Sequence, residues 1–337
     1  MKRKDFLHKI GAITVAGAVA GGVPSAFGPL KLLRPNRLKK GDRIGLVSPA
    51  GILYQTELFD RMETELKNMG LIPVYGEHVR NRYGYLAGRD EERAADLNRF
   101  FADPDIHAIM AVRGGWGSNR ILDMIDFDSI RKHPKIFCGF SDITSLHLAI
   151  LKKSRIVTFH GPNGNSEWTP FTTRHFKKLL FDAELPVFQN PASEIEALYS
   201  IRKGVSHGPL AGGNLSVFST LIGSDYMPDL SGAILFLEDI GEDIYRIDRM
   251  LTHLTLSGVL NRISGFVFGR CTDCRESAAG SLTLQEVLEH HIGRLNIPAF
   301  YGSMISHEPN QFTLPVGVQV SIDAEKGTLK LLEPAVV

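Results

Sequence analysis

The sequence has few cysteines and no dense basic cluster beyond its first residues. Three cysteines in 337 residues are too few for a disulfide framework, so a hydrophobic core has to hold the fold together. Lys and Arg number 38 and Asp and Glu number 37. Beyond the N-terminus the cations form no patch typical of nucleic-acid binding. We therefore predict no nucleic-acid partner.

Metal-binding and nucleotide-binding patterns are also incomplete. Cys271 and Cys274 form a lone C-x-x-C that could close a small disulfide or bind a metal, but no second cysteine pair or spaced histidine pair completes a zinc site. The glycine-rich run 113–117 is not followed by Gly-Lys-Ser/Thr. It also lacks an acidic residue about 20 positions further on, which a dinucleotide loop requires. We expect neither a metal nor a cofactor.

The first 28 residues differ from the rest of the chain and are typical of an export signal. Arg3 and Lys4 precede a weakly apolar, Gly/Ala-rich stretch from Ile10 to Val23, which is the order found in secretory signals. The basic pair resembles a twin-arginine signal with Lys4 as its second member. A stretch of about 14 such residues is too short to span a ~30 Å hydrocarbon core. We predict cleavage within 25–28, a periplasmic or secreted protein, and no permanent membrane anchor.

Short apolar runs then alternate with amphipathic stretches, which predicts repeated βα units. Such repeats form a parallel sheet covered by helices on both faces. We therefore expect an α/β protein with a flavodoxin-like or Rossmann-like N-terminal domain at 37–168. The predicted strands are 43–47, 72–75, 107–112 and 136–138, and the predicted helices are 58–69, 90–101, one from 119, and 143–153.

A second, smaller α/β domain is expected at 208–337. A polar stretch with three prolines, 169–207, separates the two halves, and we interpret it as a linker. In the second half, strands are predicted near 233–237, 264–269, 318–322 and 328–332, and helices near 245–255 and 284–295.

Ser141 is the candidate nucleophile. It lies in Gly-Phe-Ser-Asp, directly after a predicted strand and before a predicted helix, where parallel sheets place their ligand-binding loops. A serine on such a turn is typical of a nucleophile elbow. The second glycine of G-x-S-x-G is missing, so a helix cap formed by Ser141 or Asp142 is the alternative.

His307 and Glu238 are the candidate partners of this serine. His307 lies in a loop, whereas several other histidines fall in helical patterns, and loops on a rigid scaffold commonly carry catalytic groups. Glu238 and Asp239 follow an apolar strand. Successive side chains of a strand point to opposite faces, so one of the two should face the site. The alternative for either acid is a charge near the N-terminus of the helix expected at 245–255.

Together these motifs resemble the LD-carboxypeptidase family, which includes murein tetrapeptide carboxypeptidases and microcin C self-immunity peptidases. The resemblance spans about 37–334, and Ser306 stands where the family commonly has glycine. The matching stretches occur in order at 41–44, 48–51, 113–117, 139–144, 160–162, 210–215, 236–239, 245–249 and 307–317.

The resemblance implies a serine peptidase with Ser141 as nucleophile, His307 as general base and Glu238 as the residue that orients the base. The leaving group would be a terminal D-amino acid, as in a murein tetrapeptide, and the protein would be a homodimer. The backbone N–H groups implied as the oxyanion hole belong to Asp142, Gly114 and Gly115. The side chains expected to contact substrate are Arg113, as the candidate for a carboxylate, Trp116 and Asn214.

Two alternatives stay open. The same triad would serve a related peptidase or amidase that inactivates a peptide antibiotic or a peptidyl-nucleotide conjugate. A two-domain α/β chain behind an export signal would also suit a non-catalytic periplasmic ligand-binding protein.

Overall fold

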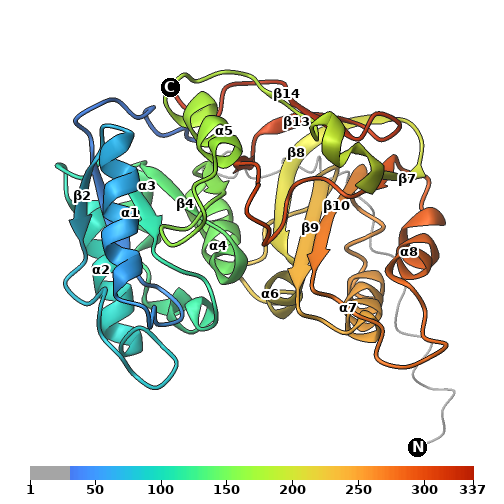
Figure 1. The fold of residues 1–337 in the computed structure, drawn as a ribbon, viewed down its shortest axis with the longest axis horizontal. Coiled ribbons are helices and arrows are strands. Elements are labelled where there is room, and N and C mark those ends of the chain that lie inside the picture. Colours follow the sequence, from blue (N-terminus) through green and yellow to red (C-terminus); the bar gives the residue numbers. More distant parts are fainter. Residues whose placement is uncertain (1–30) are drawn as a thin grey trace, which may run out of the picture. The chain divides into compact units, whose positions relative to one another are not determined.

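The computed structural model describes residues 31–337, and these form two sheets (Figure 1). The export signal expected at 1–28, with its cleavage site, lies outside the described residues. Within the described part of the chain, every helix is too short or too polar to cross a membrane.

The first sheet is the parallel α/β sheet that the βα alternation predicts. Its six strands follow the order β12-β5-β4-β3-β1-β2; β1 to β5 run parallel and β12 lies antiparallel beside β5. Its elements are β1 (Arg43–Val47), α1 (Glu57–Asn68), β2 (Ile72–Tyr75), α2 (Asp90–Ala102), β3 (Ala108–Ala111), η1 (Ser118–Met124), α3 (Phe127–Lys132), β4 (Ile136–Gly139), η2 (Ser141–Ile143), α4 (Thr144–Ser154), β5 (Thr158–His160) and β12 (Leu314–Val316).

Helices cover both faces of this sheet because its strands are apolar on both sides. Leu46 of β1 belongs to the same buried cluster as Phe59 of α1. The next residue, Val47, belongs to a second buried cluster with Phe100 of α2. Successive side chains of a strand point to opposite faces, so one strand contributes to both cores. A continuous apolar run is therefore the expected sequence for it.

The second sheet has eight strands in the order β6-β14-β13-β8-β9-β10-β11-β7. Its strands β8 to β11 run parallel, and the outer strands pair antiparallel. Its elements are β6 (Val187–Phe188), β7 (Tyr199–Arg202), β8 (Val205–Asn214), α6 (Leu215–Thr220), β9 (Ile234–Ile240), α7 (Ile244–Leu256), β10 (Gly265–Thr272), α8 (Leu284–Leu288), β11 (Ala299–Tyr301), β13 (Gln319–Asp323) and β14 (Thr328–Leu331).

Two segments differ from the expected layout. The stretch 169–207, which we interpreted as a linker, contains helix α5 (Pro170–Leu180) and supplies β6 and β7, the two edge strands of the second sheet. Edge strands tolerate nearby prolines, which is why the proline-rich sequence did not indicate them. The helix expected at 284–295 is also interrupted, because α8 ends at Leu288 and a π-helical turn over Glu289–Gly293 continues it.

The strand pair β8–β9 leaves no room for a side chain at Gly212. Its backbone has φ 150°, and a Cβ atom built there would lie 1.7 Å from the carbonyl oxygen of Phe236. We expect Gly212→Ala to lower the free energy of unfolding by about 3 kcal/mol or more, because backbone cannot yield as a flexible side chain can. Denaturant unfolding measures this.

Gly293→Ala is the matched control. Its nearest neighbour atom would be 3.9 Å from an added Cβ, and its φ is not positive. Replacing a helical glycine in open space should leave stability unchanged or raise it by about 0.5–1 kcal/mol. Equal effects of the two substitutions would contradict this account of Gly212.

Candidate active site

Ser141 occupies a strained turn between β4 and α4. Its φ is 65°, in the left-handed region that non-glycine residues seldom adopt, at a cost on the order of 1–3 kcal/mol. A nucleophile elbow requires this kind of sharp turn. Neither Ser141 nor Asp142 caps the helix with its side chain. Instead Asp142 accepts a hydrogen bond from the backbone N–H of Ser118 at 2.8 Å.

The glycine-rich turn after β3 lies against this serine. A Cβ atom at Gly114 would be 2.8 Å from the Ser141 Cβ and 3.2 Å from the Asp142 nitrogen. Gly115 beside it has φ 105°. A side chain at Gly114 would therefore clash with Ser141. The turn brings the backbone of Gly114 next to that of Asp142, two of the three residues expected to form the oxyanion hole.

His307 and Glu238 are hydrogen-bonded to each other. The Nδ1 atom of His307 lies 2.7 Å from Oε2 of Glu238, a fully buried carboxylate near the end of β9. The Phe140 ring, one residue before Ser141, lies 4.8 Å from the imidazole centroid. The base therefore packs on the chain segment that carries the serine.

The second ring nitrogen of His307 is the one left for proton transfer. Nε2 is buried and has no hydrogen-bond partner among the described residues, so no hydrogen bond joins it to Ser141 in this structure. Catalytic hydrogen bonds often form only once substrate is bound. Because Nδ1 is held by Glu238, Nε2 is the atom that can accept the serine proton.

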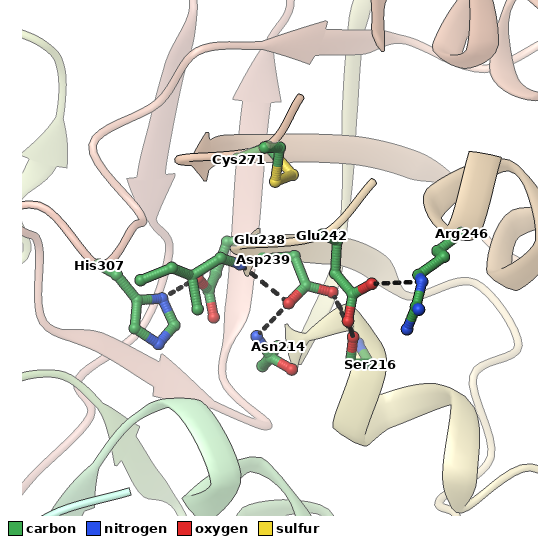
Figure 2. The surroundings of a disulfide bond; sticks show 10 residues. Asn214, Ser216, Glu238, Asp239, Glu242, Arg246, Cys271 and His307 are labelled. Carbon is green, nitrogen blue, oxygen red and sulfur yellow. Dashed lines mark hydrogen bonds and ion pairs between the residues drawn. A yellow bond between two sulfur atoms is a disulfide. The ribbon is translucent and has the colours of Figure 1, made fainter. Parts of the chain in front are cut away.

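Two carboxylates control the charge of the base. Burial lowers the pKa of His307, but the attraction of Glu238, its hydrogen bond and the charge of Asp239 together raise that pKa above its ordinary value. Asp239 points away from the imidazole (Figure 2) and accepts hydrogen bonds from Asn214 and Ser216. Burial and the nearby Glu238 raise the pKa of Asp239 to about 6.

The three side chains expected to contact substrate lie in two different places. Arg113 and Trp116 line one surface pocket, and Arg113 also donates a hydrogen bond to the Ile52 carbonyl at 2.6 Å. Asn214 instead caps α6, where its side-chain oxygen accepts from the Val217 N–H, and its amide nitrogen donates to Asp239. The structure thus holds Asn214 beside Asp239, and its expected contact with substrate stays a prediction.

Arg270 is a supporting residue that the sequence did not indicate. Its partly buried guanidinium forms ion pairs with Glu308 and, at 2.7 Å, with Glu194. Its backbone N–H donates to the Ile305 carbonyl at 3.0 Å. The end of β10 thereby holds the loop that carries His307. These partners are 38 and 76 residues away in the chain, so no local pattern could have revealed them.

Cys271 and Cys274 form a disulfide immediately after Arg270 (Figure 2). Of the two roles that the C-x-x-C left open, the structure therefore shows the disulfide. Cys138 is a free, buried thiol. Within residues 31–337, no three His, Cys, Asp or Glu side chains are grouped so that they could hold a metal ion.

A serine on a strained strand-to-helix turn beside a buried carboxylate–histidine pair is a candidate site of the serine-hydrolase type. The chain belongs to the LD-carboxypeptidase family. Residues 44–161 match the model of the LD-carboxypeptidase N-terminal domain, and residues 207–322 match that of the C-terminal domain. The protein is therefore a peptidase of that family, on the α/β fold that the βα alternation predicts.

Relatives support this family from both sequence and structure. The probable murein peptide carboxypeptidase of Bacillus subtilis is 37% identical over 303 residues, covering 88% of this chain and 93% of the relative. The microcin C7 self-immunity protein MccF of Escherichia coli is 30% identical over 329 residues, covering 88% and 94%.

Solved structures agree with these relatives. MccF in complex with glutamyl sulfamoyl guanosine superposes with a TM-score of 0.84 at 27% identity, covering 90% of this chain and 100% of that one. The muramoyltetrapeptide carboxypeptidase from Oxalobacter formigenes has a TM-score of 0.76 at 30% identity, covering 86% and 97%.

Glu238→Gln tests the role of the buried carboxylate. The substitution should lower kcat by about 10³-fold to 10⁴-fold, because the imidazole loses the partner that fixes its tautomer. A base must be neutral to act, so the acid limb of kcat/KM reports the pKa of His307. In Glu238→Gln the negative charge beside the imidazole is gone, so the effect of burial, which lowers the pKa of His307, dominates. The acid limb should therefore move to lower pH.

Glu242→Gln is the control, because Glu242 contacts Ser216 and Arg246, and His307 is not among its partners (Figure 2). It should leave the acid limb in place. An acid limb that stays fixed or rises in Glu238→Gln would show that Glu238 does not set the charge of the base.

Arg270→Gln tests the positioning of the base loop. Loss of both ion pairs should lower kcat by about tenfold or more and change KM less, because small displacements of a catalytic group are costly. Arg270→Lys should recover part of the loss. Arg275→Gln is the control, since that more exposed arginine pairs with Asp243 instead. A change confined to the melting temperature would make Arg270 purely structural.

Proposed function

We propose that this protein is a serine LD-carboxypeptidase that releases a C-terminal D-amino acid, D-alanine, from murein tetrapeptide-type substrates. One observation carries the proposal: the His307–Glu238 pair packs against the elbow that presents Ser141. The relatives named murein peptide and muramoyltetrapeptide carboxypeptidase support the substrate class.

In the proposed mechanism, Nε2 of His307 takes the Ser141 proton while the serine oxygen attacks the carbonyl carbon of the scissile bond. The backbone N–H groups of Asp142, Gly114 and Gly115 stabilise the oxyanion, and each lost donor would cost roughly 10²-fold to 10³-fold in rate. Protonated His307 then donates its proton to the leaving amine, and the D-amino acid departs. Water activated by His307 hydrolyses the acyl-enzyme. Glu238 stabilises the imidazolium throughout.

The free carboxylate of the departing residue needs a cationic or N–H partner. Arg113 is our candidate for this contact. It follows β3 on the same loop as Gly114, and among the described residues its guanidinium is bonded through one nitrogen, to the Ile52 carbonyl.

A second candidate function is hydrolysis of a peptidyl-nucleotide conjugate or peptide antibiotic. The likeness to MccF, whose structures include complexes with sulfamoyl nucleosides, favours it. The same serine, histidine and glutamate would carry out the chemistry, so the two functions differ only in the groups that surround the scissile bond.

We also propose that the protein is exported through its N-terminal segment, acts in the periplasm or outside the cell, and forms a homodimer. The basic and apolar order of residues 1–28 supports export. Cell fractionation of the native protein and light scattering of the purified one test the two points separately.

D-alanine release from purified murein tetrapeptide, followed by mass spectrometry, tests the main proposal. Wild type should release it, and Ser141→Ala and His307→Ala should each lower kcat by about 10⁴-fold or more. A peptidyl nucleotide is assayed in parallel. A preference for that substrate above about tenfold, ~1.4 kcal/mol, would replace the first function by the second. Full activity of Ser141→Ala would remove the serine mechanism.

A further inference from the structure

The end of β10 connects the strand that carries the acid to the loop that carries the base. Within this segment, residues 270–272, Cys271 is the register partner of Asp239, the residue directly after Glu238. Arg270, one residue earlier, holds the base loop through its ion pair and its backbone hydrogen bond. Paired strands lie about 4.8 Å apart. A displacement of this segment therefore reaches both the acid and the base.

The disulfide between Cys271 and Cys274 closes the turn that follows this segment (Figure 2). Inside the turn, Asp273 has φ 55°, in the left-handed region that non-glycine residues seldom adopt. A backbone hydrogen bond from the Cys274 N–H to the Cys271 carbonyl, at 3.3 Å, also closes the turn. The Gly241 N–H donates to the Thr272 carbonyl at 2.8 Å. The disulfide thus fixes the backbone where β9 and β10 end side by side.

This disulfide has the properties of a bond that can be broken and re-formed in the folded protein. Both cysteines are partly exposed, and the stretch 275–280 that follows them is exposed throughout. They are 3 positions apart, so the bond removes less entropy from the unfolded chain than one that closes a long loop. The C-x-x-C spacing is common in disulfides that exchange with dithiols, and exposed disulfides are among the more easily reduced.

The pairing of acid and base depends on the position of the end of β9. Oε2 of Glu238 lies 2.7 Å from His307, and Oε1 has no hydrogen-bond partner among the described residues. Within that part of the chain, one hydrogen bond therefore orients the carboxylate. A misplacement of about 1 Å can cost 10²-fold in rate, so a small shift of the strand end or of the base loop is enough to lower kcat.

We propose that the Cys271–Cys274 disulfide is a redox switch of the active site. The intact bond holds residues 270–272 in place, so that Glu238 and His307 stay paired, and reduction releases this segment and lowers the activity. A dithiol reductant supplies two electrons and two protons: the S–S bond breaks, both cysteines become thiols, and the reductant becomes a disulfide. The inference rests on the proposed serine mechanism and adds its regulation.

The switch has a consequence for the proposed export. Cysteines are kept as thiols in the reducing cytoplasm, and disulfides form and persist outside it. The peptidase would therefore stay in its less active form until it has left the cytoplasm. Peptides that contain the same scissile bond would be spared inside the cell.

The test compares oxidised and reduced wild-type protein. Dithiothreitol, a dithiol, reduces the bond, and mass spectrometry after alkylation counts the free thiols. We expect reduction to lower kcat for D-alanine release from murein tetrapeptide by about tenfold or more, with a smaller change in KM, and reoxidation to restore it. Circular dichroism checks that the reduced protein is folded at the assay temperature.

Replacement of both cysteines by serine, Cys271→Ser with Cys274→Ser, removes the bond permanently. This double variant should have the kcat of reduced wild type, and dithiothreitol should not change it further. Cys138→Ala is the matched control, because Cys138 is the third cysteine of the chain and is a buried free thiol. It should respond to dithiothreitol as wild type does.

Equal kcat in the oxidised and reduced protein would overturn the inference, as would full activity of the double variant. A loss that accompanies unfolding and does not return on reoxidation would make the bond purely structural. Labelling of Ser141 by a fluorophosphonate is measured in parallel, because it reports activation of the serine by its base whatever the peptide. If labelling follows the redox state but no D-alanine is released, the switch stands and the proposed substrate does not.

Discussion

The hydrogen bond between His307 and Glu238 is the interaction on which the geometry of the candidate active site depends. A fully buried carboxylate needs a partner, since an unpaired buried charge costs several kcal/mol. For Oε2 of Glu238 that partner is His307, while Oε1 has none among the described residues. The acid at the end of β9 and the loop that carries the base therefore hold each other in place.

The path of the chain explains why this pair meets the serine. His307 lies between β11, a strand of the second sheet, and β12, which pairs with β5 of the first sheet. The base is thus carried on the segment that crosses from one sheet to the other. Arg270 holds that segment on both sides of His307, through the Ile305 carbonyl and Glu308, and the pairing of β12 fixes its end. Mechanically, the base loop is anchored to both sheets, and loops anchored at both ends can orient catalytic groups well.

Strain is concentrated where these segments meet. Ser141 has a left-handed backbone, and the glycine turn beside it has no room for a Cβ atom at Gly114. Such features persist only when the surrounding structure holds them, and they cluster at functional sites. Here the hydrogen bonds from Ser118 to Asp142 tie the two turns together. The strained backbone of Ser141 lowers stability locally, and it places the serine at the edge of the sheet.

Local patterns explain what could be predicted from the sequence. The first βα units follow from apolar runs at regular spacing, and Ser141 follows from its place between a strand and a helix. The edge strands β6, β7 and β12 are two to four residues long and show no alternation, so only tertiary pairing defines them. The sequence contains enough information to predict the cap formed by Asn214, because asparagine before a helix is a strong N-cap signal. The ion pairs of Arg270 were not, since they join distant parts of the chain.

The buried Glu238–His307 pair and the exposed loops after β1, β2 and β3 are separate parts of the molecule. This separation bears on how one fold can serve different substrates. Relatives named for murein peptides and for microcin immunity share this architecture. Acyl transfer by a serine needs the same groups whatever the acyl donor, so the buried Glu238–His307 pair cannot distinguish the substrates. The exposed loops after β1, β2 and β3 carry no core packing at Tyr54, Tyr85 or Trp116. These three side chains, unlike Gly114 and Gly115 of the loop after β3, can change without disturbing the turn beside Ser141, and they are where we expect relatives with different substrates to differ.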